Sequence, residues 1–170
     1  MNAIDAILSR RSIRKYTQEP VSEKVLKEIL EAAMSAPSAG NEQPWHFVVI
    51  NDPAILHEIP KFHPYSQSLK MASVAILVCG DLALQKHKDF WIQDCSAATQ
   101  NILIAVHAKG LGAVWLGLYP RAERVAGMRA LLGIPDHVIP LAIIPIGYPA
   151  EDKPPAMRFN ASRIHYNRWQ

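Results

Sequence analysis

Four short apolar segments, separated along the chain by helical and polar stretches, constrain the fold more than any other feature of this sequence. They read WHFVVI at residues 45–50, VAILV at 74–78, AVWL at 113–116 and VIPLAIIPI at 138–146. Short apolar runs of this kind are typical of buried strands. The strands are interleaved with helices but do not follow a regular strand–helix–strand rhythm. The pattern therefore predicts an α+β protein, a three-layer α/β/α sandwich with a mixed, mostly antiparallel sheet.

Helical spacing of apolar side chains predicts a long central helix over residues 91–107. Shorter helices are expected over residues 2–9, 53–59 and 123–132, and one more is expected to begin after Ser22, which is suited to be its N-cap. The apolar stripe of the long helix consists of Ile92, Cys95, Thr99, Ile102, Leu103 and Val106.

The apolar segment at residues 138–146 contains two prolines, Pro140 and Pro145. Proline has no N–H to donate to a neighbouring strand. We therefore expect this segment to be an edge strand or to contain a bulge, rather than to be an undisturbed central strand.

The composition supports one domain over residues 1–170, because 49% of the residues are hydrophobic and only 19% are charged. The last segment, residues 147–170, is rich in proline and then polar. We expect it to be an extended C-terminal arm that lies on its own domain or on a partner subunit. The aromatic and apolar side chains of the arm that need such a surface are Phe159, Ile164, Tyr166 and Trp169.

The charge and cysteine content excludes several classes of function. A formal net charge of +3 is too small for the basic stripe of a nucleic-acid-binding protein, and a few arginines around one anionic ligand account for it equally well. Cys79 and Cys95 form no CxxC pair and are expected to be reduced core thiols. We predict a cytoplasmic protein, because the sequence has no signal peptide and no apolar run that could span a membrane. The spacing of the histidines predicts no metal site, and no side chain is predicted to act as a general acid or base.

A basic segment follows the first helix, with Arg10, Arg11, Ser12 and Arg14 within five residues. Several guanidinium groups with a neighbouring hydroxyl suit a phosphate monoester, because they offer charged bidentate donors and a neutral one. The alternative is a solvated basic turn between two helices.

The loop before the first strand reads SAPSAGNEQPW over residues 35–45. Small side chains allow the backbone to approach a flat ligand closely. The amides of Asn41 and Gln43 offer donors and acceptors that suit the edge of a heterocycle. The alternative is an ordinary connection between a helix and a strand.

The sequence RRSIRKY at residues 10–16, followed by SAPSAGNEQPW, resembles the N-terminal signature of the nitroreductase family. The resemblance continues with GLGAVWLG at residues 110–117 and IPIGYP at 144–149, so it covers essentially the whole chain. It implies an α+β sandwich that binds FMN non-covalently at the interface of an intertwined homodimer.

The resemblance also implies roles for individual residues. Arg10, Arg11 and Ser12 match the segment at the FMN phosphate and ribityl chain, and Arg14 matches a residue near the phosphate or the pyrimidine side of the flavin. Residues 38–43 match the loop that commonly reaches the flavin of the other subunit. The expected cofactor-binding residues outside the basic segment are Ser38, Asn41, Gln43, Trp115, Leu116 and Gly117 near the flavin ring and Arg158 at the phosphate.

The activity implied by the resemblance is FMN-dependent reduction of nitroaromatic, quinone or related acceptors by NADH or NADPH. The glycine-rich segment at residues 110–117 is not a GxGxxG motif, so no Rossmann domain is expected and NAD(P)H has to visit the flavin transiently. A ping-pong mechanism follows as a hypothesis. The alternatives are a flavin-binding redox sensor and a relative with different flavin chemistry.

One further prediction concerns an irregular stretch of the chain. Residues 62–65 are predicted to cap the flavin pocket.

Overall fold

The computed structural model describes residues 1–169, and Gln170, the last residue of the expected arm, lies outside this part. Its sheet runs in the order β1 (Trp45–Ile50), β2 (Val74–Asp81), β5 (Val138–Gly147) and β3 (Gly112–Ala113), while β4 (Leu116–Gly117) also pairs with β5. These strands pair antiparallel. An isolated bridge between Ser12 and Ala113 is parallel. The predicted α+β class with a mixed, mostly antiparallel sheet is confirmed.

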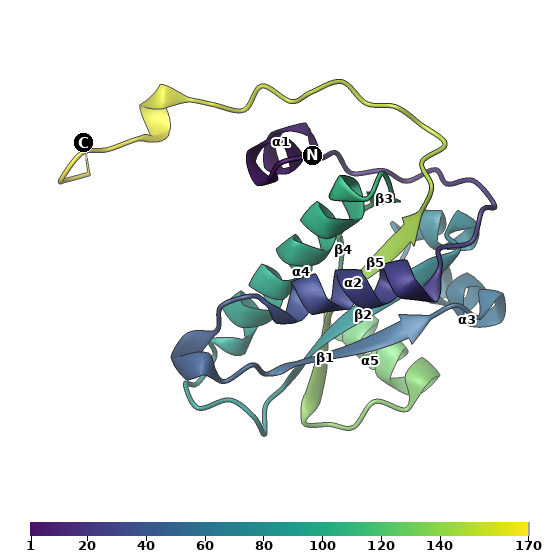
Figure 1. Cartoon of the computed structure of the whole chain (residues 1–170). Helices are drawn as coiled ribbons and strands as arrows, with labels where there is room; N and C mark the ends of the chain where they lie inside the picture. The colour runs from purple at the N-terminus through teal and green to yellow at the C-terminus, as the bar shows by residue number, and fades with distance from the viewer. Residues whose placement is uncertain (170) are drawn as a thin grey trace.

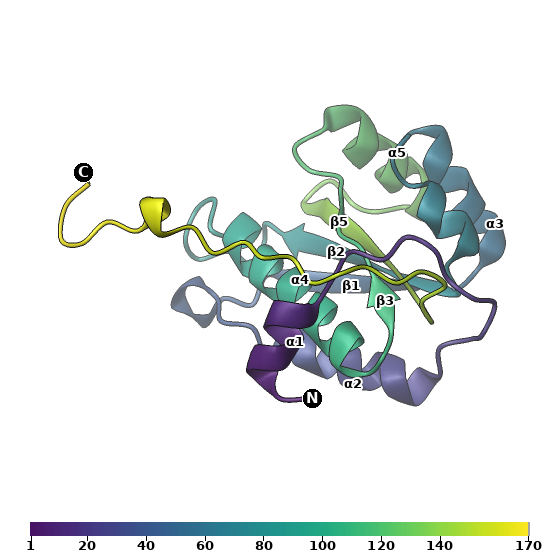
Figure 2. The ribbon, with the colours of Figure 1, turned by 90° about the horizontal axis from the view of Figure 1, so that it is seen from above.

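Helices cover both faces of this sheet (Figures 1 and 2). On one face lie α2 (Glu23–Met34) and α4 (Trp91–Ala108), and on the other lie α3 (Pro53–Glu58) and α5 (Ala122–Leu132). Each face of the sheet has its own hydrophobic core. The strand β2 contributes to both cores, because its alternate side chains point to opposite faces. Val74, Ile76 and Val78 pack with α2 and α4, whereas Ala75, Leu77 and Cys79 pack with the core that contains α3 and α5.

The helix ends follow the local sequence signals. Ser22 accepts a hydrogen bond from the Val25 N–H and caps α2, as predicted. The first helix, α1 (Ala3–Ser9), lies near the C-terminal end of α4 (Figure 1). Gly133 ends α5 in the left-handed region, with φ of 66°.

The prediction of an edge strand at residues 138–146 is wrong, whereas the prediction of a bulge is confirmed. The strand β5 lies inside the sheet, between β2 on one side and β3 and β4 on the other. Its register against β2 shifts between Val78, which faces Ala142, and Cys79, which faces Pro140. The strand can be central because Pro140 lies where the ladder is already interrupted.

The expected single strand at residues 113–116 is divided into β3 and β4. Val114 and Trp115 separate the two strands, but the register against β5 continues, since Ala113 faces Ile146 and Leu116 faces Ile143. The predicted strand therefore exists and follows β5, with its pairing broken in the middle.

The C-terminal arm packs on its own domain only in its first part. The Lys153 ammonium donates to the Ser12 carbonyl at 2.7 Å, and Arg11 Nε donates to the Pro154 carbonyl at 2.8 Å. Beyond this point the arm runs across the top of the domain and projects past it (Figures 1 and 2). The large exposed apolar side chains of this distal part are Met157, Phe159, Ile164, Tyr166 and Trp169. Within residues 1–169 no helix is long and apolar enough to cross a membrane.

Candidate functional site

The basic segment is fixed against the glycine-rich segment by backbone pairing. The Ile13 N–H donates to the Ala113 carbonyl at 2.9 Å, next to the parallel bridge of Ser12 with Ala113. The Ile13 side chain packs directly on Gly112, where a Cβ would lie 2.7 Å from Ile13 Cγ2. The Tyr16 hydroxyl donates to the Ile13 carbonyl at 2.6 Å. These contacts set the direction in which the neighbouring arginines point.

The guanidinium groups of Arg10, Arg11 and Arg158 gather near the C-terminal end of α4, where His107 lies. The pKa of Arg10 is lowered, first by burial and then by the charges of Arg158 and Arg11. His107 lies beside them, and burial together with the charges of Arg10 and Arg11 lowers its pKa. Within residues 1–169 the buried Arg11 Nη2 has no hydrogen-bond acceptor. A group of mutually repelling cations with an unused donor fits an anion such as a phosphate.

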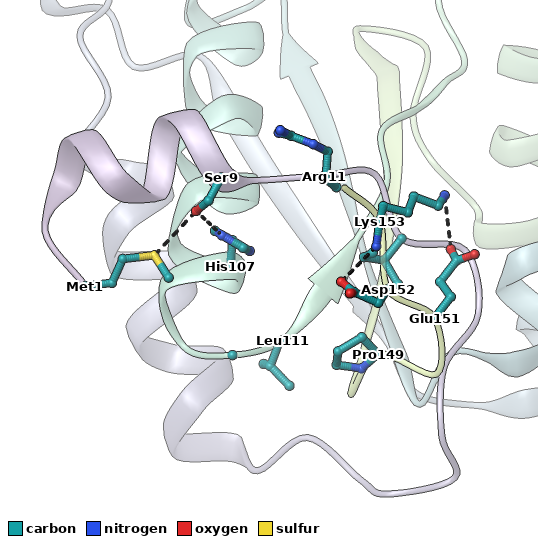
Figure 3. Close-up of a pocket in the computed structure, with 11 residues that line it drawn as sticks. Met1, Ser9, Arg11, His107, Leu111, Pro149, Glu151, Asp152 and Lys153 are labelled. Atoms are coloured by element: carbon teal, nitrogen blue, oxygen red, sulfur yellow. Dashed lines mark hydrogen bonds and ion pairs between the residues drawn. The ribbon is translucent and has the colours of Figure 1, made fainter. Parts of the chain in front are cut away.

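A small cavity of about 220 Å³ adjoins this group (Figure 3). Arg11 and His107 line it, and the Ser9 hydroxyl lies 2.7 Å from His107 Nε2. The opposite wall comes from the first part of the arm, including Pro149 and Glu151. The basic segment and the arm therefore form one surface.

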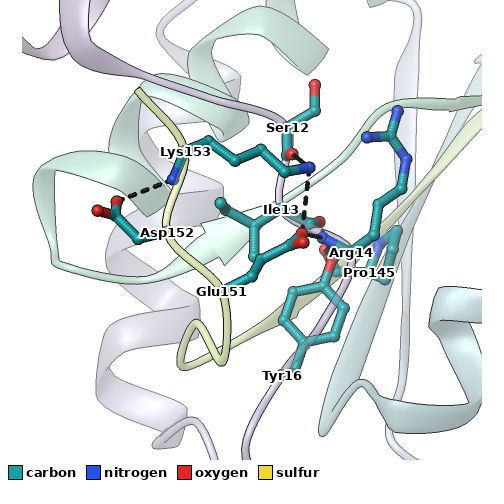
Figure 4. A network of polar contacts seen from close by, with 8 residues as sticks. All are labelled: Ser12, Ile13, Arg14, Tyr16, Pro145, Glu151, Asp152 and Lys153. Carbon is teal, nitrogen blue, oxygen red and sulfur yellow. Dashed lines mark hydrogen bonds and ion pairs between the residues drawn. The ribbon is translucent and has the colours of Figure 1, made fainter. Parts of the chain in front are cut away.

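A polar network holds Arg14 by its backbone rather than by its side chain (Figure 4). The Arg14 N–H donates to Glu151 Oε1 at 2.6 Å, and the Lys153 ammonium lies 3.2 Å from the same oxygen. The Arg14 N–H and Lys153 lower the pKa of Glu151 against the effect of its burial. The Arg14 guanidinium points away from Glu151 (Figure 4).

A larger hollow of about 440 Å³ lies beside Arg14. The sequence prediction that residues 62–65 cap the pocket fits only in part: Pro64 and Tyr65 line this hollow, whereas Phe62 packs on Gly127 and His63 is buried. Residues that the sequence analysis did not select complete the lining. They are Lys15, Gln67, Ser68, Met71, Glu151 and Lys153.

The hollow contains one unsatisfied buried group, because the Ser68 hydroxyl has no hydrogen-bond partner within residues 1–169. Gln67 and Ser68 belong to a short 3-10 helix, Gln67–Met71, in a stretch that has no sequence motif. The nearest signal in the sequence was the lack of regular periodicity in this stretch, which was too general to select either residue.

The segment Trp115–Gly117 contributes mainly backbone. Trp115 is half-buried against the core of α2 and α4, and Leu116 is buried in the other core. Gly117 is partly exposed, and a Cβ on it would meet nothing within 4 Å, so a ligand can approach its backbone. Arg124 Nη1 donates to the Gly117 carbonyl at 2.9 Å, and the Arg124 guanidinium lies 5.6 Å from the centre of the Tyr65 ring.

The loop of residues 38–43, which we call the amide loop, lies at the other end of α4 (Figure 1). The Gln43 N–H donates to the Ser38 hydroxyl at 3.0 Å, and the Gln43 amide donates to Asn41 Oδ1 at 2.9 Å. Both Asn41 and Gln43 have positive φ, 54° and 48°. The polar pair predicted from the sequence is thus pre-arranged on the surface.

The structure does not bring the two halves of the predicted site together within one chain. The amide loop is attached at Asp94, where the Ala39 N–H donates to Asp94 Oδ1 at 3.0 Å. The arginine group lies at His107, thirteen residues further along α4. At 1.5 Å per residue, these positions are about 20 Å apart.

Comparison with known proteins identifies the family. The model of the nitroreductase family matches residues 7–66 and 64–148. The chain belongs to the nitroreductase family.

Relatives of this nitroreductase-family chain match it over nearly its whole length. A protein of Methanothermobacter thermautotrophicus, provisionally named NADH dehydrogenase/NAD(P)H nitroreductase, is 52% identical over 169 residues, which cover 99% of this chain and 88% of that protein. A crystal structure of a protein of the same provisional name from Parabacteroides distasonis has a TM-score of 0.95 at 39% identity, covering 99% and 100% of the two chains.

A third relative was crystallised with its cofactor. This provisionally named nitroreductase from Desulfovibrio desulfuricans, solved in complex with FMN, has a TM-score of 0.86 at 34% identity, and the match covers 100% of this chain and 99% of that one. The three-layer fold predicted from the sequence is thus the fold of this family.

Proposed function

We propose that this protein is an FMN-dependent NAD(P)H oxidoreductase that reduces nitroaromatic, quinone or related acceptors. The observation that carries the proposal is the group formed by Arg10, Arg11 and Arg158 next to the hollow at Arg14. A phosphate and a flat ring suit these two places, and the Desulfovibrio desulfuricans relative was solved with FMN.

The residues present fit this cofactor. Arg10, Arg11, Ser12 and Arg158 would hold the phosphate, and the unused Arg11 Nη2 supports this assignment. Arg14, which lines the hollow, would face the pyrimidine side of the ring, and the open backbone at Gly117 would be free to contact the other side. FMN supplies the redox chemistry when it is bound, and the chain supplies binding and electrostatics.

The side chain of Arg14 can favour reduction of whatever ring occupies the hollow. Among residues 1–169 its guanidinium has no carboxylate partner, and Glu151 binds the Arg14 N–H and Lys153 instead. A fixed positive charge stabilises a ring more after the ring has gained electrons than before. The proton on the acceptor can come from water, so no general acid is assigned.

We further propose that the functional unit is a homodimer with FMN at the subunit interface. The amide loop lies about 20 Å along α4 from the arginine group, so Ser38, Asn41 and Gln43 serve a ligand bound to a second copy. The distal arm supports this proposal, because its exposed Phe159 and Trp169 need a surface that their own domain does not supply.

Anaerobic spectroscopy tests the activity. The purified protein is expected to retain FMN, to be bleached by NADH or NADPH, and to be reoxidised by a nitroaromatic compound or a quinone. Parallel lines in initial-rate plots support the ping-pong order, whereas intersecting lines contradict it. Bound flavin that neither nicotinamide reduces would instead indicate a redox sensor or another flavin chemistry. A location in the cytoplasm stays a prediction from the sequence.

A further inference from the structure

A pair of buried carboxyl groups, Glu42 and Asp94, connects the amide loop to the start of α4. Glu42 stands between Asn41 and Gln43, and only 7% of its surface is exposed. Asp94 lies in the first turn of α4, with 4% exposed. Charged groups are rarely buried to this extent without partners, so the contacts of this pair need an account.

The two carboxyl groups tie three segments together. Glu42 Oε2 accepts hydrogen bonds from the backbone N–H groups of Lys86, at 2.6 Å, and His87, at 2.9 Å. Asp94 Oδ1 accepts from the Ala39 N–H at 3.0 Å. The amide loop is thereby attached to the loop before α4 and to α4 itself.

The remaining oxygens of the pair face each other. Glu42 Oε1 and Asp94 Oδ2 are both buried and have no donor among residues 1–169 when both groups are ionised, and the two groups lie close enough for each to shift the pKa of the other through a bond carried by one proton. Two ionised carboxylates cannot form this bond, because neither has a hydrogen to donate. One proton shared by the pair would satisfy both of these buried oxygens.

The surroundings place this proton on Asp94. Burial, followed by the hydrogen bond and the charge of Glu42, raises the pKa of Asp94. Burial opposes ionisation of Glu42 as well, but the N–H groups of His87 and Lys86 and the bond to Asp94 lower its pKa. The other titratable groups that face the pair are His87, whose charge favours both carboxylates, and the buried thiol of Cys95.

The conformation of the loop explains why this attachment matters. Asn41 and Gln43, on either side of Glu42, both lie in the left-handed region that non-glycine residues rarely adopt. Such residues keep this conformation only where the surrounding structure fixes it. The imidazole of His87 lies directly over Gly40, where a Cβ would be 2.5 Å from His87 Nε2.

We propose that Glu42 and Asp94 are positioning residues, which use one shared proton to hold Asn41 and Gln43 in their ligand-binding arrangement and so make FMN retention depend on pH. This inference rests on the proposed function. When the pH rises far enough to remove the shared proton, two buried carboxylates repel each other and the amide loop moves away from α4.

The variant Asp94→Asn distinguishes a shared proton from a purely structural role of the pair. In Asp94→Asn the new amide can donate to Glu42 while its oxygen still accepts from Ala39, so the hydrogen bonds remain and the titrating proton is removed. Glu42→Gln makes the same change from the other side and serves if Asp94→Asn fails to fold. Glu123→Gln, an exposed carboxyl in the first turn of α5, is the matched control.

The first measurement is the dissociation constant of FMN, which is determined from flavin fluorescence at pH values from about 6 to about 9. We expect FMN binding by the wild-type protein and by Glu123→Gln to weaken about tenfold as the rising pH removes the shared proton, the equivalent of one pKa unit of linkage. FMN binding by Asp94→Asn is expected to change less than about twofold. Equal pH dependence in the wild type and in Asp94→Asn would overturn the proposal.

A second measurement does not involve the flavin. Hydrogen exchange of the Ala39, Lys86 and His87 N–H groups in the protein without FMN is expected to lose protection at alkaline pH in the wild type but not in Asp94→Asn. Protection that is the same in both proteins overturns the positioning role even if FMN binds. Loss of protection as expected, in a protein that never binds FMN, supports the attachment and instead refutes the proposed function.

Discussion

Arg124 Nη1 donates a 2.9 Å hydrogen bond to the carbonyl oxygen of Gly117. The same guanidinium lies over the ring of Tyr65, so one side chain of α5 connects the backbone of β4 to the rim of the Arg14 hollow. Arg124 therefore sets the relative position of two walls that would face the proposed flavin.

Replacement of Arg124 tests this arrangement. In Arg124→Ala we expect FMN to bind about tenfold more weakly, because Gly117 and Tyr65 lose a common support and a hydrogen bond to a charged donor is worth about 1.5–3 kcal/mol. Flavin fluorescence titration measures the effect. Arg124→Lys should recover little, since an ammonium cannot lie flat over the ring and also reach Gly117. Full recovery of FMN binding in Arg124→Lys would argue against the combined contact of Arg124 with Gly117 and Tyr65.

Removal of the proposed cofactor contacts should reduce flavin retention directly. Arg10→Ala and Arg14→Ala are each expected to weaken FMN binding by about tenfold or more, since each loses a charge-assisted contact. Arg163→Ala, in the short 3-10 helix of the arm, is the control and should bind normally. Unchanged flavin occupancy in both the Arg10 and the Arg14 variants refutes the assignment.

Glu151 gives a prediction for stability against pH. Its pKa in the folded protein is lowered, chiefly by the Arg14 N–H and with help from Lys153. A lowered pKa stabilises the fold above the ordinary pKa of the group, and this contribution is lost as the pH falls through the folded-state pKa. At neutral pH we expect Glu151→Gln to have a free energy of unfolding about 1 kcal/mol lower than that of the wild type, and therefore to unfold at a lower temperature. The difference should shrink in acid, and a difference that grows in acid contradicts this account of Glu151.

The distal arm should control assembly. Deletion of the chain after Ala156 removes the exposed apolar side chains Met157, Phe159 and Trp169. We expect light scattering to show a shift from dimer toward monomer, accompanied by loss of FMN. Arg158→Ala in the full-length chain is the control, because it should weaken FMN binding while the dimer persists. A truncated protein that remains fully dimeric shows that the arm does not hold the subunits together.

The sequence was most informative where a local pattern determines the structure. The apolar runs at residues 45–50 and 74–78 became β1 and β2, and Ser22 became the cap of α2. The place of residues 138–146 in the sheet was not predictable from Pro140 and Pro145. A bulge can absorb a proline inside a sheet, and the strands that pair on either side are set by contacts distant in sequence.

The residues of the candidate site also divide into those that the sequence identifies and those that only the structure identifies. Arg10 and Arg14 could be selected because charged groups in a short motif are recognisable without a structure. Ser68 and Arg124 could not, since their positions depend on how β4, α5 and an irregular segment pack. The sequence also did not reveal that Glu42, in the middle of the amide loop, is turned inward to Asp94.

Mixing two inactive variants tests most directly whether two chains build each flavin site. Arg14→Ala lacks the ring contact on one chain, and Asn41→Ala lacks the contact from the amide loop of its partner. Dimers that contain one subunit of each kind have one site with both defects and one intact site. We predict that unfolding and refolding the two variants together restores tight FMN binding to about a quarter of the sites, as random pairing requires. Mixed dimers that form but bind no more FMN than either variant alone would contradict a site shared between subunits.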